Sequence, residues 1–202
     1  MSIDLDKLLD FARFTHEIRK VERMILLEGE DHYENDAEHS YQMAIIALFI
    51  IDSNGLKLDR YKCMAMAIAH DVIEVYAGDT LVFAPQKDLD AKTLREKKAI
   101  EKLKTNWPNI PSLHSLIKEY ETRQSPEAKF VYALDKLMPE INNYLYEGRI
   151  WRQLGVNLGQ VKKIKQGKID IDTTIKDYHQ QLLRIIEQKP ELFGEPDESR
   201  GE

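Results

Sequence analysis

The feature that most constrains the fold is a series of helix start and stop signals with no convincing run of alternating β-branched residues between them. Residue types that cap helix N-termini stand ahead of four apolar helical patterns, at Asp36, Asp59, Ser125 and Asp172. Proline follows Ser125 at the first helical position, where its missing N–H costs no hydrogen bond. These signals predict an all-α fold.

The expected helices follow one another without a linker, a repeat or a low-complexity tract. They span about residues 4–26, 36–53, 59–76, 90–106, 111–122 and 173–188, with a further helix beginning at Pro126. A chain of 202 residues is of the size that one hydrophobic core serves. We therefore expect a single-domain helical bundle over residues 1–189. Residues 190–202 begin with proline and are largely polar, so we expect a flexible C-terminal tail.

Composition and charge exclude several classes of protein. The 29 Lys and Arg residues are outnumbered by 35 Asp and Glu, which argues against a dedicated binder of duplex nucleic acid. No 18-residue apolar run is present, so no membrane-spanning helix is expected. The acidic start lacks the apolar segment of a signal peptide, and the single cysteine, Cys63, cannot form an internal disulfide. A cytoplasmic protein is expected.

Polar residues within apolar helical segments are the candidates for chemistry, because burying a charge is costly unless it is paired or bound to a metal. Such residues occur on three different predicted helices, at His39, at the pair His70-Asp71 and at Asp135. A helical bundle can bring them to one interior point. Two imidazoles and two carboxylates suit one divalent ion, such as Mn, Co, Fe or Zn, and are compatible with Mg.

Two further carboxylates are placed to act on a water beside such an ion. Glu74 lies three residues after Asp71 and four after His70, so it projects from the same side of the helix as both. A carboxylate in that position is the expected general base. Asp79, just beyond Gly78, can bond a substrate hydroxyl or the attacking water. Taken singly, each residue is explained as well by an ordinary helix surface or core position; their joint pattern favours a site.

The order of these residues resembles the signature of the HD-domain metal-dependent phosphohydrolases. Ala37-Glu38-His39-Ser40, and the stretch from His70-Asp71 through Glu74 to Asp79, are similar to the 5'-deoxynucleotidase branch of that superfamily. The similarity extends over about residues 8–185. It implies an all-α HD-domain fold that is often a homodimer. It also implies that the metal ligands are His39, His70, Asp71 and Asp135, and that Glu74 and Asp79 are catalytic.

The resemblance also implies a basic residue that binds the substrate phosphate. The nearest equivalent in this chain is Arg23, which is followed by Met24 where that branch has tryptophan. The implied activity is removal of phosphate from small phosphate monoesters, (deoxy)nucleoside 5'-monophosphates above all, by attack of a metal-activated water. Two other interpretations stay open: a regulatory protein that binds metal or nucleotide with little turnover, and a purely structural helical protein.

Overall fold

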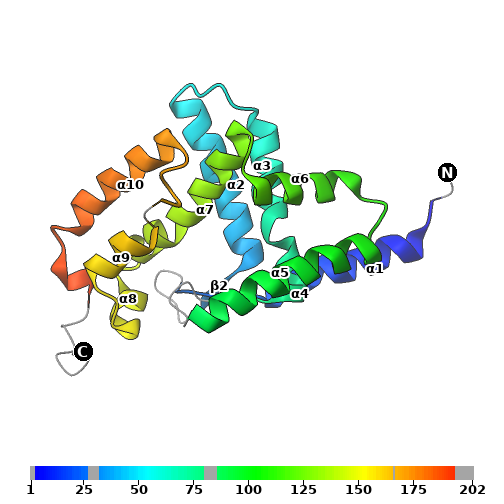
Figure 1. Ribbon diagram of the computed structural model, residues 1–202, viewed down its shortest axis with the longest axis horizontal. Coiled ribbons are helices and arrows are strands. Elements are labelled where there is room, and N and C mark those ends of the chain that lie inside the picture. The colour runs from blue at the N-terminus through cyan, green and yellow to red at the C-terminus, as the bar shows by residue number, and fades with distance from the viewer. Residues whose placement is uncertain (1–2, 27–31, 80–85, 166, 194–202) are drawn as a thin grey trace.

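The computed structural model describes residues 3–26, 32–79, 86–165 and 167–193, and the statements below concern these residues. The chain is helical almost throughout, with one short β-hairpin near its start (Figure 1). The α-helices, in chain order, are α1 (Leu5–His16), α2 (Asp36–Ser53), α3 (Arg60–Ala69), α4 (Glu74–Ala77), α5 (Gln86–Asn106), α6 (Pro111–Thr122), α7 (Pro126–Leu145), α8 (Arg149–Leu154), α9 (Leu158–Lys165) and α10 (Thr173–Ile186). The 3₁₀ turns are η1 (Glu17–Lys20), η2 (His70–Ile73) and η3 (Pro190–Leu192), and the strands are β1 (Glu22–Leu26) and β2 (Tyr33–Asn35).

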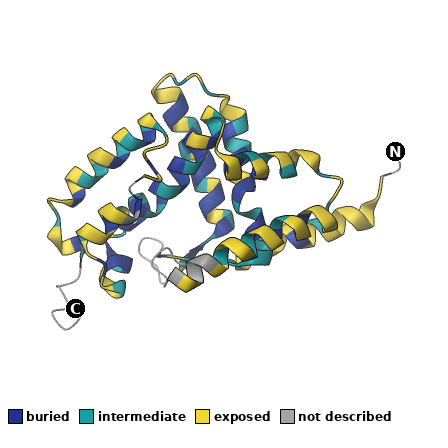
Figure 2. Cartoon of the chain, viewed as in Figure 1, coloured by how far each residue is buried: buried dark blue, intermediate teal, exposed yellow. Residues whose placement is uncertain are grey.

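Three groups of buried apolar side chains hold the helices together. The largest joins α2, α3, α7 and α10, and includes the fully buried Met43, Met66 and Phe130. The second joins α1, η2, α5 and α6, and the third lies between α8, α9, α10 and η3. The buried faces of the central helices point toward one another, and the outer faces are exposed (Figure 2). The expected all-α fold is confirmed.

Local capping agrees with the sequence at three of the four predicted sites. Asp59, Ser125 and Asp172 each accept hydrogen bonds from backbone N–H groups in the first turn of α3, α7 and α10. The cap of α2 is Asn35 instead of Asp36, because the Asn35 side chain and Glu38 form a reciprocal capping box. This shift by one residue places Asp36 in the first helical turn, where its side chain is fully buried.

Two predicted helices are shorter than expected. The helix predicted over residues 4–26 ends at His16, and β1 then pairs antiparallel with β2, with Glu22 opposite Asn35 and Leu26 opposite Tyr33. Tertiary pairing overrides helix propensity there. The helix predicted over residues 59–76 changes to the 3₁₀ turn η2 at His70, and this tighter winding sets the direction of the His70 and Asp71 side chains.

The packed chain extends past the predicted boundary at residue 189. Leu192 is buried and the ring of Phe193 stacks on Trp151, with ring centroids 5.1 Å apart. The folded part therefore reaches Phe193, and the rest of the predicted tail, residues 194–202, lies outside the described residues. Among the described residues, no helix has both the length and the apolar character needed to cross a membrane.

The close approach of η3 to α8 yields a stability prediction. Gly148 and Gly155 flank α8 with similar positive φ angles of 66° and 63°. A Cβ at Gly148 would overlap the backbone carbonyl of Leu192, whereas a Cβ at Gly155 meets nothing within 4 Å. Both alanine variants should lose about 1–2 kcal/mol from left-handed strain. Gly148→Ala should lose a further 1–3 kcal/mol, roughly, from overlap.

Urea denaturation of the two variants measures the difference in the free energy of unfolding. Equal losses for Gly148→Ala and Gly155→Ala would show that η3 does not pack against α8 as described.

Candidate functional site

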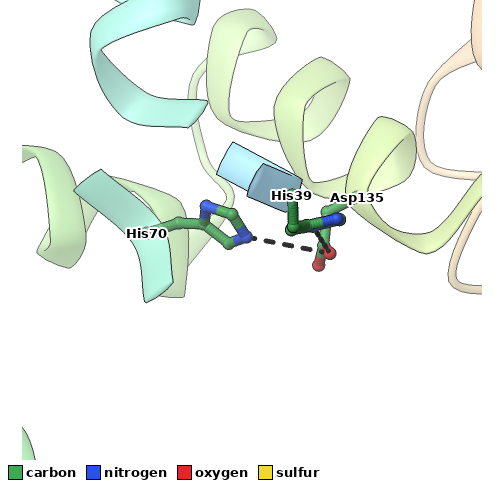
Figure 3. Close-up of side chains that lie close together, drawn as sticks. All are labelled: His39, His70 and Asp135. Carbon is green, nitrogen blue, oxygen red and sulfur yellow. Dashed lines mark hydrogen bonds and ion pairs between the residues drawn. The ribbon is translucent and has the colours of Figure 1, made fainter. Parts of the chain in front are cut away.

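Three buried side chains from distant parts of the chain meet at one point. His39 comes from the first turns of α2, His70 from η2 and Asp135 from the middle of α7 (Figure 3). Each offers one nitrogen or oxygen, and these three atoms lie within 4.8 Å of one another. His39 Nε2 is 3.2 Å and His70 Nε2 is 3.7 Å from the same Asp135 oxygen, Oδ1. The predicted convergence of these three residues is present.

The surroundings of His70 fit a bound cation. Its Nδ1 lies 2.8 Å from the carbonyl oxygen of Ala67, which can only accept, so Nδ1 carries the proton. The lone pair of a neutral His70 then sits on Nε2 and faces Asp71 Oδ2 at 3.1 Å as well as Asp135. Nε2 is buried without a hydrogen-bond partner. The lone pair on Nε2 and the oxygens of the two carboxylates are all hydrogen-bond acceptors, so they repel one another. A cation bound between them removes this repulsion.

The spacing of these atoms also suits a metal ion. Ligand atoms bound at about 2.1 Å on adjacent positions of one ion lie about 3 Å apart, close to the separations above. Without an ion, a proton takes its place. Burial alone lowers the pKa of His70, but the carboxylates of Asp71 and Asp135 outweigh burial and raise that pKa to about 10.

The other atoms of these residues are held by neighbours that orient them. His39 Nδ1 lies 3.6 Å from Glu34 Oε2, a buried carboxylate on β2. The second oxygen of Asp135, Oδ2, accepts from the Tyr120 hydroxyl at 2.5 Å and from Lys136 Nζ at 2.6 Å. Partners of this kind are typical of metal centres, where they fix which atom of a side chain faces the ion. Burial opposes the ionised form of Asp135, but Lys136 and the two histidines keep its pKa well below the usual range.

Asp71, the fourth predicted ligand, lies at the side of the group. Neither of its oxygens belongs to the group of atoms from His39, His70 and Asp135 that lie within 4.8 Å of one another. Its Oδ2 nevertheless contacts His70 Nε2 and lies 2.9 Å from Arg23 Nη1. Although burial disfavours its charge, His70 and Arg23 hold the pKa of Asp71 below its usual value.

Arg23 reaches the site from β1 and binds three carboxylates. Its Nη1 contacts Asp36 at 3.1 Å in addition to Asp71, and its Nε lies 3.3 Å from Glu34. Burial penalises the guanidinium, but Asp71 and the other carboxylates outweigh burial and raise the pKa of Arg23. Asp36 shows the reverse balance: burial and the nearby Asp71 raise its pKa to about 7 despite Arg23. Arg23 thus ties the hairpin and α2 to the His70-Asp71 turn.

Glu74 and Asp79 follow the His70-Asp71 turn in the chain. Glu74 is buried in α4, and burial together with the charge of Asp71 raises its pKa to about 8, against the opposing effect of Lys92. Lys92 Nζ, from α5, lies 3.7 Å from Glu74 and 4.0 Å from Asp79. Gly78, with φ of 70°, turns the chain between the two carboxylates. Both line a cavity of about 470 Å³, as do His70, Asp71 and Asp135.

The structure adds residues that sequence reasoning missed. They support the predicted residues or line the same cavity: Glu34, Asp36, Lys92, Tyr120 and Lys136. Only Asp36 and Lys136 carried a signal, because both are charged residues adjacent to apolar helical patterns. Asp36 was predicted to cap a helix, and no role was predicted for Lys136.

The fold and the site define a class of protein: an all-α chain whose buried histidines and aspartates are gathered at a helix junction beside a cavity. A family model described as HD domain matches residues 15–175, and the chain belongs to the HD-domain family. The membership expected from the sequence is confirmed.

Relatives and solved structures agree with this assignment. The chain is 32% identical over 134 residues to the 5'-deoxynucleotidase HDDC2 of Homo sapiens, covering 64% of this chain and 63% of that protein. The match to the Danio rerio protein of the same name is 30% over 148 residues, covering 71% of each. A crystal structure of a predicted metal-dependent phosphohydrolase from Magnetospirillum magnetotacticum MS-1 superposes with a TM-score of 0.79 at 28% identity, covering 94% of this chain and 95% of that one. The alignment thus spans less than two thirds of the human relative.

The role of Arg23 in holding the site together yields a prediction. Arg23→Met leaves Glu34, Asp36 and Asp71 buried without their cation, so metal-free protein should lose about 3–5 kcal/mol of unfolding free energy. The matched control is Arg13→Met, which removes an exposed arginine paired with Asp10 and should cost under about 1 kcal/mol. Chemical denaturation in the presence of a chelator measures both. Similar small losses would contradict the structural role of Arg23.

Proposed function

We propose that this protein is a metal-dependent phosphomonoesterase that acts on nucleoside 5'-monophosphates, deoxynucleotides above all. The observation that carries the proposal is the group of buried ligand atoms from His39, His70 and Asp135 beside a cavity that Glu74 also lines. The names of the relatives and of the structural neighbour support the reaction type and the substrate class.

His39, His70, Asp71 and Asp135 would hold one divalent ion in this proposal. When bound, such an ion polarises a phosphoryl oxygen and lowers the pKa of water. The donor set of two imidazoles and two carboxylates suits Mn, Co, Fe or Zn, and is compatible with Mg. Each donor already has a partner that orients it, so the site needs little rearrangement to accept the ion.

Side chains of the protein transfer the proton, position the catalytic carboxylates and bind the phosphate in this proposal. Glu74 accepts the proton of the attacking water, and its raised pKa makes it a stronger base than an exposed carboxylate. Lys92 holds Glu74 and Asp79 in place, and Asp79 bonds the leaving hydroxyl or the water. Arg23 also lines the cavity. Its three carboxylate partners on β2, α2 and η2 contact only Nε and Nη1, so Nη2 can contact a phosphate oxygen. No protein nucleophile is required.

The decisive experiment is phosphate release from a panel of deoxy- and ribonucleoside 5'-monophosphates by wild type and by Glu74→Gln. Metal-stripped protein receives Mn, Co, Mg or Zn in turn. Loss of the general base should lower kcat by about 10²–10⁴ while the metal stays bound. Glu96→Gln is the matched control, because Glu96 lines the same cavity and also pairs with Lys92. Its kcat should stay within a few-fold of wild type.

The outcomes separate the proposal from the regulatory alternative. Metal-dependent release that Glu74→Gln lacks and Glu96→Gln keeps supports a phosphomonoesterase. A wild type that binds one ion tightly but releases phosphate from no nucleotide supports a binding protein. A wild type that binds no ion and shows no response to chelation supports the purely structural interpretation.

We also propose that the protein is a cytoplasmic homodimer. Large apolar side chains are exposed on α2 at Tyr41, Ile45 and Phe49 and on the adjoining α3 at Tyr61 and Ile68. Such a patch favours an interface, and uncharged side chains can face their own copies across a two-fold axis without like-charge repulsion. The buried free thiol of Cys63 is compatible with a reducing compartment.

The dimer proposal predicts that a charge on this patch separates the copies. Phe49→Asp should sediment as a monomer, whereas Ile185→Asp, which charges an exposed apolar position on α10, should keep the wild-type mass. Analytical ultracentrifugation distinguishes the two. A monomeric wild type, or a Phe49→Asp variant that stays dimeric, would refute the proposed interface.

A further inference from the structure

Two lysines line the cavity from the C-terminal part of the chain and have no role in the site described above. Lys165 is the last residue of α9, and Lys168 follows it in the turn before α10. The turn is fixed on both sides: the Lys168 N–H donates to the Lys165 carbonyl at 3.1 Å, and the neighbouring Ile169 is fully buried in the main core. The backbone at Lys168 and Ile169 is therefore fixed relative to the end of α9.

The ammonium group of Lys165 lacks a close anionic partner. The residue is only 6% exposed, yet no carboxylate of the described residues lies within 4.0 Å of its Nζ. Burial lowers the pKa of Lys165 to about 8, and the nearby Glu140 compensates only in part, because Glu140 pairs with His179 at 2.9 Å. A buried cation without a paired anion is costly unless a ligand supplies the anion.

Three other cations that line the cavity have carboxylate partners, and a fourth, Arg123, lies over the Tyr132 ring and donates to the Glu121 carbonyl. Arg23 binds Asp71, Lys136 binds Asp135, and Lys92 lies near Glu74. Lys168 is exposed, but burial of its stem and the charges of Lys136 and Lys92 lower its pKa. Positive charge therefore collects where Lys165 and Lys168 meet the cavity, without a carboxylate ion pair of their own in the described chain.

Lysine and arginine side chains line the cavity in the same number as carboxylates, six of each. A divalent ion bound there would add positive charge and so favour an anionic ligand.

We propose that Lys165 and Lys168 form a phosphate-binding subsite of the cavity and contact phosphoryl oxygens of the substrate monoester, in addition to the contact from Arg23 Nη2. The inference rests on the proposed function for the identity of the substrate, but the subsite can be tested with inorganic phosphate alone. Two other lysines of α9 differ from this pair: Lys162 and Lys163 are exposed and do not line the cavity, whereas Lys165 and Lys168 do.

The test is calorimetric titration of inorganic phosphate into Mn²⁺-loaded protein. Loss of a charge-assisted hydrogen bond should weaken phosphate binding by at least about tenfold in Lys165→Met and in Lys168→Met. Mn²⁺ affinity should stay at the wild-type value in both. Lys163→Met is the matched control, because it removes an exposed lysine from the same helix and should leave phosphate binding unchanged. If Lys165→Met fails to fold, Lys168→Met carries the test alone.

The outcomes also separate the subsite from the proposed reaction. Wild-type phosphate affinity in both variants, or no phosphate binding by wild type, overturns the subsite. So does an equal loss in Lys163→Met, which would indicate a general effect of net charge. If both variants hydrolyse nucleotides with the KM of wild type, the proposed reaction is supported and the proposed subsite is refuted. If no nucleotide is hydrolysed but phosphate binding depends on both lysines, the subsite stands and the substrate lies elsewhere among phosphate monoesters.

Discussion

The organisation of this protein depends on one electrostatic constraint: the imidazole of His70 faces carboxylates on the side that its proton does not occupy. The Ala67 carbonyl takes the Nδ1 proton, and Nε2 is left between Asp71 and Asp135. Such an arrangement is stable only with a cation at its centre, either a proton on the ring or a metal ion. Three helical segments and the β-hairpin contribute residues to this point.

Neighbouring side chains hold the His39, His70, Asp71 and Asp135 side chains in place. Arg23 joins the hairpin to η2, Glu34 faces the far nitrogen of His39, and Tyr120 ties α6 to Asp135. These contacts fix side chains whose burial would otherwise be unfavourable, and they set which atoms face the cavity. The same principle distinguishes Arg23 from Lys165. Arg23 uses Nε and Nη1 to bind three carboxylates and has only Nη2 left for a ligand, whereas the ammonium of Lys165 has no ion pair within the described residues.

The sequence predicted what depends on local chemistry or on polar residues in apolar helices. The caps at Asp59, Ser125 and Asp172 are local, and they are present. His39, His70 and Asp135 stood out because burial of such groups demands a partner, and they converge. The hairpin and the supporting residues were missed, because Glu34 and Tyr120 acquire their roles only through contacts with residues distant in the chain. No local pattern marks such contacts.

The most direct test of the central claim is the metal stoichiometry of the purified protein after loading with Mn²⁺ or Zn²⁺, measured by elemental analysis beside Asp135→Asn and His179→Gln. His179 is also a buried histidine paired with a carboxylate, but it lies outside the ligand group. We expect one ion per chain in wild type and in His179→Gln, and a loss of binding in Asp135→Asn. Wild-type binding in Asp135→Asn, or none in wild type, would contradict a metal centre at this point.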